Sequence, residues 1–524
     1  MTWKTKIPYR LIDFSTRLHP SDNYVIGVKR ISDTGGAGSW VRIDENDNVV
    51  DVETNYFANH PTYDFQEVSI PIEKPSEILN DSTEETDNSE NTDDSSETQE
   101  NETLVSDGIV TDGSTGTSYD ITNDTFELNG VTYIISGRTN SSTGNSSSSS
   151  SEEDIRDKLT WNNVFLKIPK FYIKSDGNVR FWIAPAPSSH LSDEEKEQEI
   201  ETLIQKGFHV HPAFKSNGKE IDCFYVGKYQ GYIHNNRMHS VPGDIYETDT
   251  EKSGHVKPTV YVTFEQCKEA CEKWNTSSEE GAIQVDGYHM MNIHELSALQ
   301  WLSLVEIGTT NAAMEVKDGG FGIGRLYGTT LYNVDDEKSE LVDVINGSKT
   351  SAANFHGILG LWGNIWEFLD GIKVTSDNKL LIWDNDGRHI YKETNIEVPA
   401  KKRELESWVP GVTCGYYKSR LLTAGYNYDT SDLFIPDFTT LTPYYENGSY
   451  SDGVFGRVKS TYETKVCYGG GFDTGDYGGL YSYRFDIKQP AIKEVNGIDV
   501  DYGDNAGDIG ARLCFAAINL KELS

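Results

Sequence analysis

The chain has 524 residues, of which 36% are hydrophobic and 11% aromatic, enough apolar material for two or three packed domains. Its formal net charge is −37, and residues 80–155 alone hold 18 acidic residues against one basic residue. Nucleic acids and anionic membranes bind mainly to Lys and Arg, so this charge argues against both kinds of partner.

Nothing in the sequence indicates export or membrane insertion. The N-terminal stretch MTWKTKIPYRLIDF lacks the apolar core of a signal peptide, and no run of apolar residues is long enough to span a bilayer. The six cysteines do not follow the spacing of a disulfide framework. We therefore expect a protein made in a cytoplasm, with reduced thiols.

Residues 1–75 contain alternating apolar segments, such as YVIGVKRI, that are broken by turn-forming pairs. This pattern predicts a small β-rich unit. Residues 76–157 are dominated by Asp, Glu, Ser, Thr and Asn and predict a low-complexity insertion, either a flexible stalk or a tolerated surface loop. Within it, Asn129 and Gly130 predict the turn of one hairpin.

Residues 158–254 predict antiparallel strands that begin the C-terminal domain. The runs VFLKI and VRFWIA have strand composition, and two further strands should flank the turn at Asn217 and Gly218. The domain therefore opens with a sheet.

Two helices should follow these strands. Thr263 with Gln266, and Asn292 with Glu295, have the spacing of capping boxes at helix starts. Apolar residues then recur at helical spacing, which predicts that both helices are amphipathic and pack on a sheet. In the first helix these residues are Phe264, Cys267, Cys271 and Trp274, and in the second they are Leu296, Leu299, Leu302 and Val305.

From Gly308 onward the chain is rich in Gly, Asn, Asp and Tyr and has short apolar runs. Three of these runs stand out after the two helices: LWGNIWEFLDG (361–371), CYGGGFDTGDYGGLYSYRFD (467–486) and GDIGARLCF (507–515). Gly363 permits a positive φ, and the apolar residues that follow it suit a strand. These segments predict loop-rich β structure.

The order of these five elements resembles the C-type-lectin-like fold, in the form shared by formylglycine-generating sulfatase-modifying proteins and phage tropism-determinant proteins. The resemblance covers roughly residues 255–520. It implies an α+β fold with a C-type-lectin-like domain over residues 255–524, in which two helices pack on antiparallel sheets. The segment around FHVHPAF also resembles phage tail and fibre proteins, which implies a virion protein.

The same resemblance bears on catalysis. Formylglycine-generating enzymes bind copper through a cysteine pair just after the glycine-rich segment. This chain has no cysteine there, and Cys467 precedes the three glycines. We therefore expect no enzymatic activity.

Metal sites are weakly supported. His209 and His211 would share a face of a strand, but no third ligand is evident, so structural histidines with backbone partners are favoured. The motifs of calcium-dependent lectins are missing, and the acidic loop 498–508 reads as an exposed polar loop. We expect no cofactor; calcium is possible in principle but unsupported.

The strongest binding signal is the C-terminal glycine- and tyrosine-rich region, whose composition is similar to that of an antibody paratope. Tropism-determinant proteins place their receptor-contacting residues on this segment. The resemblance therefore suggests as receptor-binding candidates Phe472, Asp473, Asp476, Tyr477, Tyr481, Tyr483, Arg484 and Tyr502. Because strand alternation must bury one face, half of these rings could instead be core. Weaker candidates in an earlier cluster are Tyr416, Tyr417, Tyr426, Tyr444 and Tyr445.

These observations predict a phage virion surface protein, at a fibre or tail tip, that adheres to a host-cell receptor and is made in the bacterial cytoplasm. The receptor could be a glycan or a protein. Other virion proteins are further expected partners, and symmetric repetition favours a homotrimer, then a homodimer. Residues 1–75 would anchor the chain to the particle. The alternatives are a decoration protein whose lectin-like domain serves assembly only and, with less support, a sulfatase-modifying-type oxidase.

Overall fold

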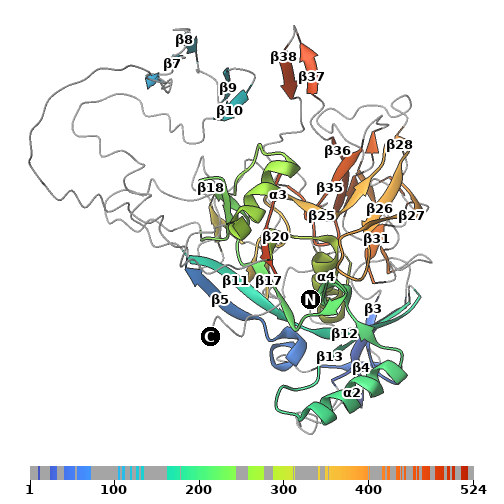
Figure 1. Cartoon of the computed structure of the whole chain (residues 1–524). Helices are drawn as coiled ribbons and strands as arrows, with labels where there is room; N and C mark the ends of the chain where they lie inside the picture. The colour runs from blue at the N-terminus through green and yellow to red at the C-terminus, as the bar shows by residue number, and fades with distance from the viewer. Residues whose placement is uncertain are drawn as a thin grey trace, which may run out of the picture. The chain divides into compact units, whose positions relative to one another are not determined.

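The computed structural model describes residues 24–31, 40–52, 56–71, 162–177, 179–242, 258–276, 287–310, 353–398, 432–436, 463–471, 478–488 and 509–516, together with shorter pieces between them (Figure 1). The chain divides into two compact units. The first comprises Met1–Pro71, Trp161–Pro490 and Gly503–Ser524, and the second Ile72–Thr160 and Ala491–Tyr502. In coarse class the fold is α+β and strand-rich.

Three α-helices lie in the described part of the chain: α2 (Asp193–Gln205), α3 (Phe264–Glu272) and α4 (Ile293–Ile307). The capping boxes predicted at Thr263 and Asn292 are both formed, and each helix begins at the next residue. Helix α2 was not predicted, although Ser192 and Glu195 form the same motif. None of the described helices is long and apolar enough to cross a membrane.

The first five-stranded sheet has the order β20-β40-β17-β11-β5. Its strands are β20 (Tyr288–Met290), β40 (Leu513–Phe515), β17 (Cys223–Gly227), β11 (Asn162–Pro169) and β5 (Gln66–Pro71). All pairs are antiparallel, and β40, near the C-terminal end of the described chain, lies between β17 and β20. In β5 and β11, Pro71 is directly opposite Asn162. The 90 residues between these positions therefore leave and re-enter the sheet at neighbouring points.

The second five-stranded sheet has the order β14-β12-β13-β2-β3. It consists of β14 (His209–Val210), β12 (Phe171–Asp176), β13 (Arg180–Pro185), β2 (Ile26–Arg30) and β3 (Trp40–Asp44). The predicted strands around YVIGVKRI and VRFWIA are thus present, and they pair with each other.

This pairing corrects the predicted boundary near residue 75. Strands β2 and β3 continue a sheet begun by β12 and β13, and β5 continues the sheet of β11. A strand needs a hydrogen-bonding neighbour, and these N-terminal strands find theirs beyond the insertion. Met1–Pro71 is therefore part of the first compact unit and does not form a separate one, and the second unit begins at Ile72.

A nine-stranded sheet follows, in the order β27-β26-β25-β35-β36-β33-β29-β32, with β39 pairing β25. Its strands are β27 (Tyr391–Glu397), β26 (Lys379–Trp383), β25 (Trp366–Val374), β35 (Thr464–Tyr468), β36 (Tyr483–Lys488), β33 (Gly453–Phe455), β29 (Tyr416–Lys418), β32 (Thr442–Pro443) and β39 (Ile509–Gly510). The GNIWEF segment thus leads into β25, near the centre of the sheet. This matches the strand predicted there.

The remaining strands form two-stranded pairs and one three-stranded sheet. In the first unit they are β1 (Arg10–Leu11) with β4 (Val50–Asp51), β15 (Lys215–Ser216) with β16 (Lys219–Glu220), β18 (Tyr232–His234) with β19 (Arg237–His239), β21 (Glu340–Val342) with β22 (Lys349–Ser351), β23 (Asn354–Phe355) with β24 (Ile358–Leu359), β28 (Ala400–Lys401) with β34 (Arg457–Val458), and β30 (Leu422–Ala424) with β31 (Phe434–Pro436). In the second unit they are β6 (Leu104–Ser106), β7 (Ile109–Thr111) and β8 (Ser118–Asp120), β9 (Thr125–Leu128) with β10 (Val131–Ile134), and β37 (Ile492–Val495) with β38 (Ile498–Asp501). The hairpins predicted at Asn129-Gly130 and Asn217-Gly218 are both formed. Four 3₁₀ helices lie in the described part of the chain: η2 (Phe57–Asn59), η3 (Pro61–Tyr63), η4 (Pro212–Phe214) and η5 (Lys273–Thr276).

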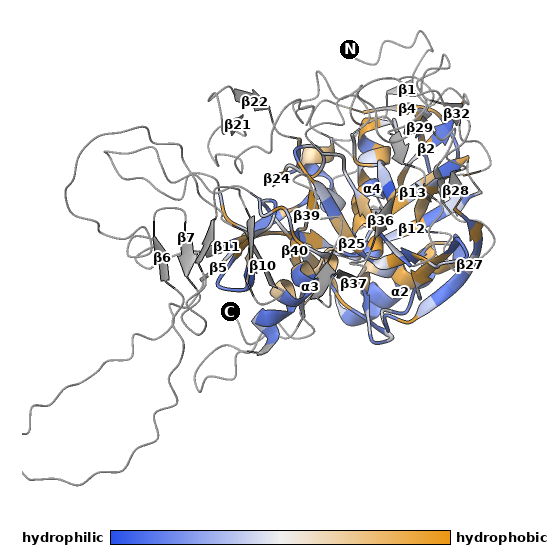
Figure 2. Cartoon of the chain, turned by 90° about the horizontal axis from the view of Figure 1, so that it is seen from above, coloured by the Kyte–Doolittle hydropathy of each residue, from blue (hydrophilic) through white to orange (hydrophobic). Residues whose placement is uncertain are grey.

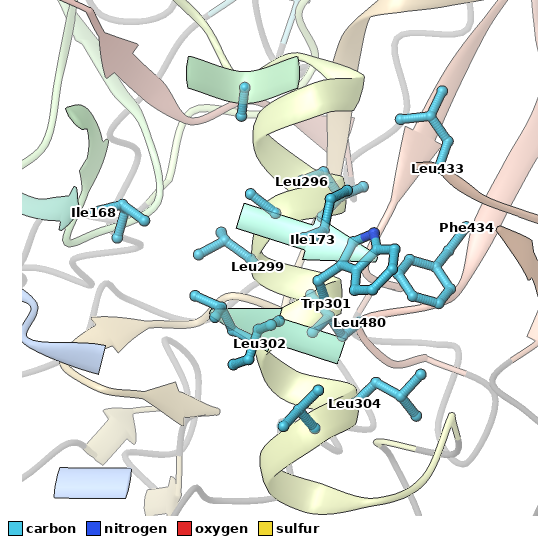
Figure 3. Packing of buried hydrophobic residues seen from close by; sticks show 14 of the residues in the cluster. Ile168, Ile173, Leu296, Leu299, Trp301, Leu302, Leu304, Leu433, Phe434 and Leu480 are labelled. Carbon is cyan, nitrogen blue, oxygen red and sulfur yellow. The ribbon is translucent and has the colours of Figure 1, made fainter. Parts of the chain in front are cut away.

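Helix α4 is the centre of the core. It contacts β13 and β2 on one sheet and β25 on the nine-stranded sheet. Leu296, Leu299 and Leu302 belong to one buried cluster with residues of both sheets, and Figure 3 shows them along the helix near Ile173 of β12. All residues from Ile293 to Val305 are buried, so the predicted single apolar stripe is only part of what this helix buries. Polar residues of α4 are buried together with its apolar ones, and Figure 2 shows both hydrophobic and hydrophilic colouring along the helix.

Candidate functional site

The predicted receptor-binding residues fall into two groups. Phe472, Asp473, Asp476, Tyr477 and Tyr502 lie outside the described residues. The others are Tyr481, Tyr483 and Arg484, which lie at the start of β36 or just before it.

Tyr481 and Tyr483 correct the prediction of a surface role. Both are fully buried, and both hydrogen bond to α4. Tyr481 Oη donates to the Gln300 carbonyl at 2.8 Å, and Gln300 Nε2 donates to Tyr483 Oη at 3.0 Å. Alternate residues of an extended segment share a face, so both rings point toward the helix. Arg484 is half-buried and belongs to the opposite face.

The chain on either side of residues 472–477 is held in the core. All five residues of β35 are buried, as is the stretch from Gly478 to Tyr483. Gly469 N donates to Ser482 O at 3.2 Å, and Gly363 N donates to Gly469 O at 3.0 Å. The six residues 472–477 therefore connect two flanks that are fixed to the nine-stranded sheet and to the GNIWEF segment.

The GNIWEF and GARLCF segments meet in a buried ion pair. Arg512 Nη2 lies 2.8 Å from Glu367 Oε1, and Arg512 Nε lies 3.0 Å from Glu367 Oε2. Both side chains are at most 1% exposed. Burial by itself lowers the pKa of Arg512, but the adjacent Glu367 carboxylate raises it above the ordinary value, so the guanidinium stays charged.

Neighbouring polar groups complete this network. Tyr468 Oη donates to Glu367 Oε2 at 2.7 Å, and Gln230 Nε2 donates to Glu367 Oε1 at 3.0 Å. Asn364, in the left-handed region at φ 65°, donates its side-chain amide to Gln230 Oε1 at 2.8 Å. The Glu367 carboxylate thus accepts four hydrogen bonds, which is its full capacity. The network is a structural junction, because Glu367 has no acceptor site left for a substrate.

The H-x-H pair does not form a ligand set. His211 is fully buried and caps η4, where its Nδ1 accepts from Ala213 N at 3.1 Å. His209 is half-exposed and lies 2.8 Å from Asp432 Oδ1. The prediction of a structural histidine with a backbone partner is confirmed for His211. Among the described residues no group of three His, Cys, Asp or Glu side chains could hold a metal ion.

Five cysteines are described, and all are free and buried: Cys223, Cys267, Cys271, Cys467 and Cys514. Burial raises the pKa of the thiols of Cys223, Cys267, Cys271 and Cys514. These four thiols stay protonated at neutral pH and are poor nucleophiles. The expected burial of Cys267 and Cys271 on one face of α3 is confirmed. Cys414 lies outside the described residues.

One polar cluster was not predicted. At the amino end of α4, His289 Nε2 lies 2.6 Å from Glu295 Oε1, and Lys268 Nζ lies 2.9 Å from Asp370 Oδ2. Beside them the exposed ring of His389 stacks on Trp383 with ring centroids 4.0 Å apart.

Beneath these groups, three residues lie side by side on neighbouring strands: Gly371 on β25, Trp383 on β26 and Tyr391 on β27. Trp383 pairs with Tyr391, and its ring lies over Gly371. Gly371 has φ 77°, and a Cβ there would lie 2.8 Å from the Trp383 ring, so glycine is required at this position. The only sequence signals for the cluster were the histidines of HMMNIHELS and WDNDGRHIY, which are about 100 residues apart.

Comparison with known proteins gives no relative that could assign a role to these residues. No family model matches the chain, and no curated protein matches it either.

Proposed function

We propose that the chain is a phage virion surface protein, at a fibre or tail tip, that adheres to a host-cell receptor through a C-type-lectin-like domain. The proposal rests on the order of the elements. Helices α3 and α4, the strand β25 after GNIWEF, the glycine-rich segment between β35 and β36, and the closing strands β39 and β40 follow one another as the resemblance requires. They all belong to the first compact unit.

The observation that carries the binding role is the anchoring of residues 472–477. Both flanks of this segment are buried and hydrogen bonded, as described above. Binding residues are commonly carried on connections between rigid elements, because the scaffold lowers the entropy lost on binding. Phe472, Asp473, Asp476 and Tyr477 combine aromatic rings with short polar side chains, the composition of adaptable contact surfaces.

A binding role also fits the buried polar groups better than catalysis does. Glu367 and Arg512 satisfy each other and their neighbours, and four of the described thiols are held in the protonated form by burial. Such groups stabilise a scaffold. We therefore propose a protein that binds and does not catalyse.

A binding assay tests this proposal. The full chain, fluorescently labelled, would be applied to a panel of bacterial cells and to a glycan array. We expect saturable binding to at least one surface, and loss of that binding in a Phe472→Ala/Tyr477→Ala double variant.

Tyr261→Ala provides the matched control, because Tyr261 is 48% exposed and lies outside the segment. Absence of binding to every surface, together with a position between other proteins in the particle, would support the assembly-only alternative and overturn the adhesion proposal.

A further inference from the structure

The amino end of α4 gathers histidines from distant parts of the sequence. His294 is the second residue of the helix, His211 caps η4 next to it, and His389 lies in the turn between β26 and β27. His211 Nε2 is 3.4 Å from Ser297 Oγ, one turn along α4, and His294 Nε2 is 3.0 Å from the Asp384 carbonyl. His211 and His294 thus connect α4 to two neighbouring elements.

The contacts of His211 require the neutral imidazole. Its Nδ1 accepts a hydrogen bond from Ala213 N, so this nitrogen must keep its lone pair. The ring is fully buried and lies against Phe171 and Phe214. Adding a proton would break the cap of η4 and place a charge among aromatic rings.

The surroundings of His294 also oppose a charge. The side chain is 4% exposed, its Nε2 position fits a donor to Asp384 O, and Nδ1 has no hydrogen-bond partner in the described structure. A proton on Nδ1 would therefore be buried without an acceptor. In addition, His294 is in the first turn of α4, where the helix dipole already presents positive charge.

The nearby carboxylates are already engaged. Asp370 pairs with Lys268, Glu295 with His289, and Asp432 with His209. Asp384 Oδ1 accepts from Arg388 N. The charged and titratable groups that face these imidazoles are His209, Lys268, His289, Glu295, Asp370, Asp384, Arg388 and Asp432, and each of the four carboxylates among them already has one of the partners named above.

We propose that His211 and His294 form an acid-sensitive latch on the first turns of α4, which holds the helix in place at neutral pH and loosens it in mild acid. Because α4 lies between two sheets, its release would loosen the centre of the first compact unit. This device is independent of which receptor the protein binds.

The direction of the pH effect follows from the folded-state pKa values. Burial lowers the pKa of His211 well below 6.5 and that of His294 from 6.5 to about 4. The unfolded chain therefore takes up protons first as the pH falls. Stability is lost from about pH 6.5 downward, and for His294 the loss is complete near pH 4. At pH 5, His294 alone lowers the folding equilibrium constant about 30-fold.

Urea denaturation of the full chain at pH 7.5 and pH 5.0, followed by tryptophan fluorescence, tests the latch. His294→Gln retains a donor at the Nε2 position but cannot be protonated, and His211→Asn retains an N-cap acceptor. For each protein we compare the folding equilibrium constant at pH 7.5 with that at pH 5.0. The factor by which this constant falls should be about 30-fold smaller for His294→Gln than for the native chain. It should also be smaller in His211→Asn. His190→Gln, at an exposed position, is the control and should behave like the native chain.

Hydrogen exchange of the native chain provides a second measurement that needs no variant. After correction for intrinsic rates, the amides of residues 293–300 should lose more protection at pH 5.0 than those of β11 and β17. Equal loss in all three elements, or an unchanged pH dependence in either histidine variant that folds at pH 7.5, would overturn the proposal.

Discussion

The buried pair of Glu367 and Arg512 offers a demanding test of the fold. Arg512 donates to both carboxylate oxygens and also to the carbonyls of Gly227, Leu359 and Gly360 at 2.7–3.1 Å. Substituting Arg512→Met would leave the carboxylate buried without its cation and would orphan these carbonyls. Removing one partner of a buried ion pair costs about 3–5 kcal/mol, so we expect a loss of that size in the free energy of unfolding.

Glu367→Gln should cost a similar amount, because it leaves the Arg512 guanidinium buried with no compensating charge. The two losses should not add in the double variant, since each substitution already breaks the same pair. Lys206→Met is the control. Lys206 pairs with Glu45 at 2.8 Å, but both side chains are 41% exposed, and such pairs contribute about 1 kcal/mol or less.

The assay is urea denaturation monitored by tryptophan fluorescence, with the midpoint compared at constant slope. A loss below about 1 kcal/mol in Arg512→Met, or fully additive losses in the double variant, would refute the view that this pair joins the GNIWEF and GARLCF segments.

Three further predictions concern the fold and its pH dependence. Replacing residues 72–161 with Asn-Gly should leave the melting temperature of the first unit within a few degrees, because Pro71 and Asn162 are already opposite each other; a large drop measured by calorimetry would show that the insertion stabilises the unit. Deleting residues 1–71 should abolish the cooperative thermal transition in circular dichroism, because β13 and β11 each lose a partner strand; a retained transition would contradict the sheet assignment. Burial opposes the charge on His289, but the adjacent Glu295 outweighs burial and raises the His289 pKa above 6.5. The His289–Glu295 ion pair therefore stabilises the fold below pH 6.5, and this stabilisation is lost as the pH rises through the folded-state pKa. His289→Gln should therefore reduce the decline in unfolding free energy above pH 6.5, and an unchanged decline would show that the pair contributes nothing.

Local signals in the sequence predicted the helices that begin with capping boxes. Thr263 and Asn292 were recognised because an apolar stripe follows each of them. Ser192 and Glu195 have the same spacing, but Leu203 is the only buried residue of α2, so no stripe marked this helix. In the sequence, the capping box alone marks the start of α2.

Partners across long sequence separations could not be predicted. The alternation in YVIGVKRI predicts a strand, but nothing in that pattern specifies pairing with β13, more than 150 residues away. For the same reason, Asn364, Glu367 and Arg512 could not be identified as one buried network. Their positions follow from the register of β25 and β35 and from the pairing of β39 with β25.

The candidate site shows a related limit. Alternation indicates that Tyr481 and Tyr483 share a face, but it does not indicate which face packs against α4. The histidines at the amino end of α4 could not be predicted as a group either, because separate segments of the chain contribute them. Only the tertiary fold brings His211 close to His294.

The adhesion proposal is tested most directly by saturable binding of the labelled full chain to bacterial cells, measured together with its Phe472→Ala/Tyr477→Ala variant and the Tyr261→Ala control. The account predicts that the native chain and the control bind at least one cell surface to saturation, and that the double variant folds but no longer binds. Equal binding by all three proteins would contradict the placement of the contact surface at residues 472–477. No binding by the native chain to any surface would contradict adhesion itself.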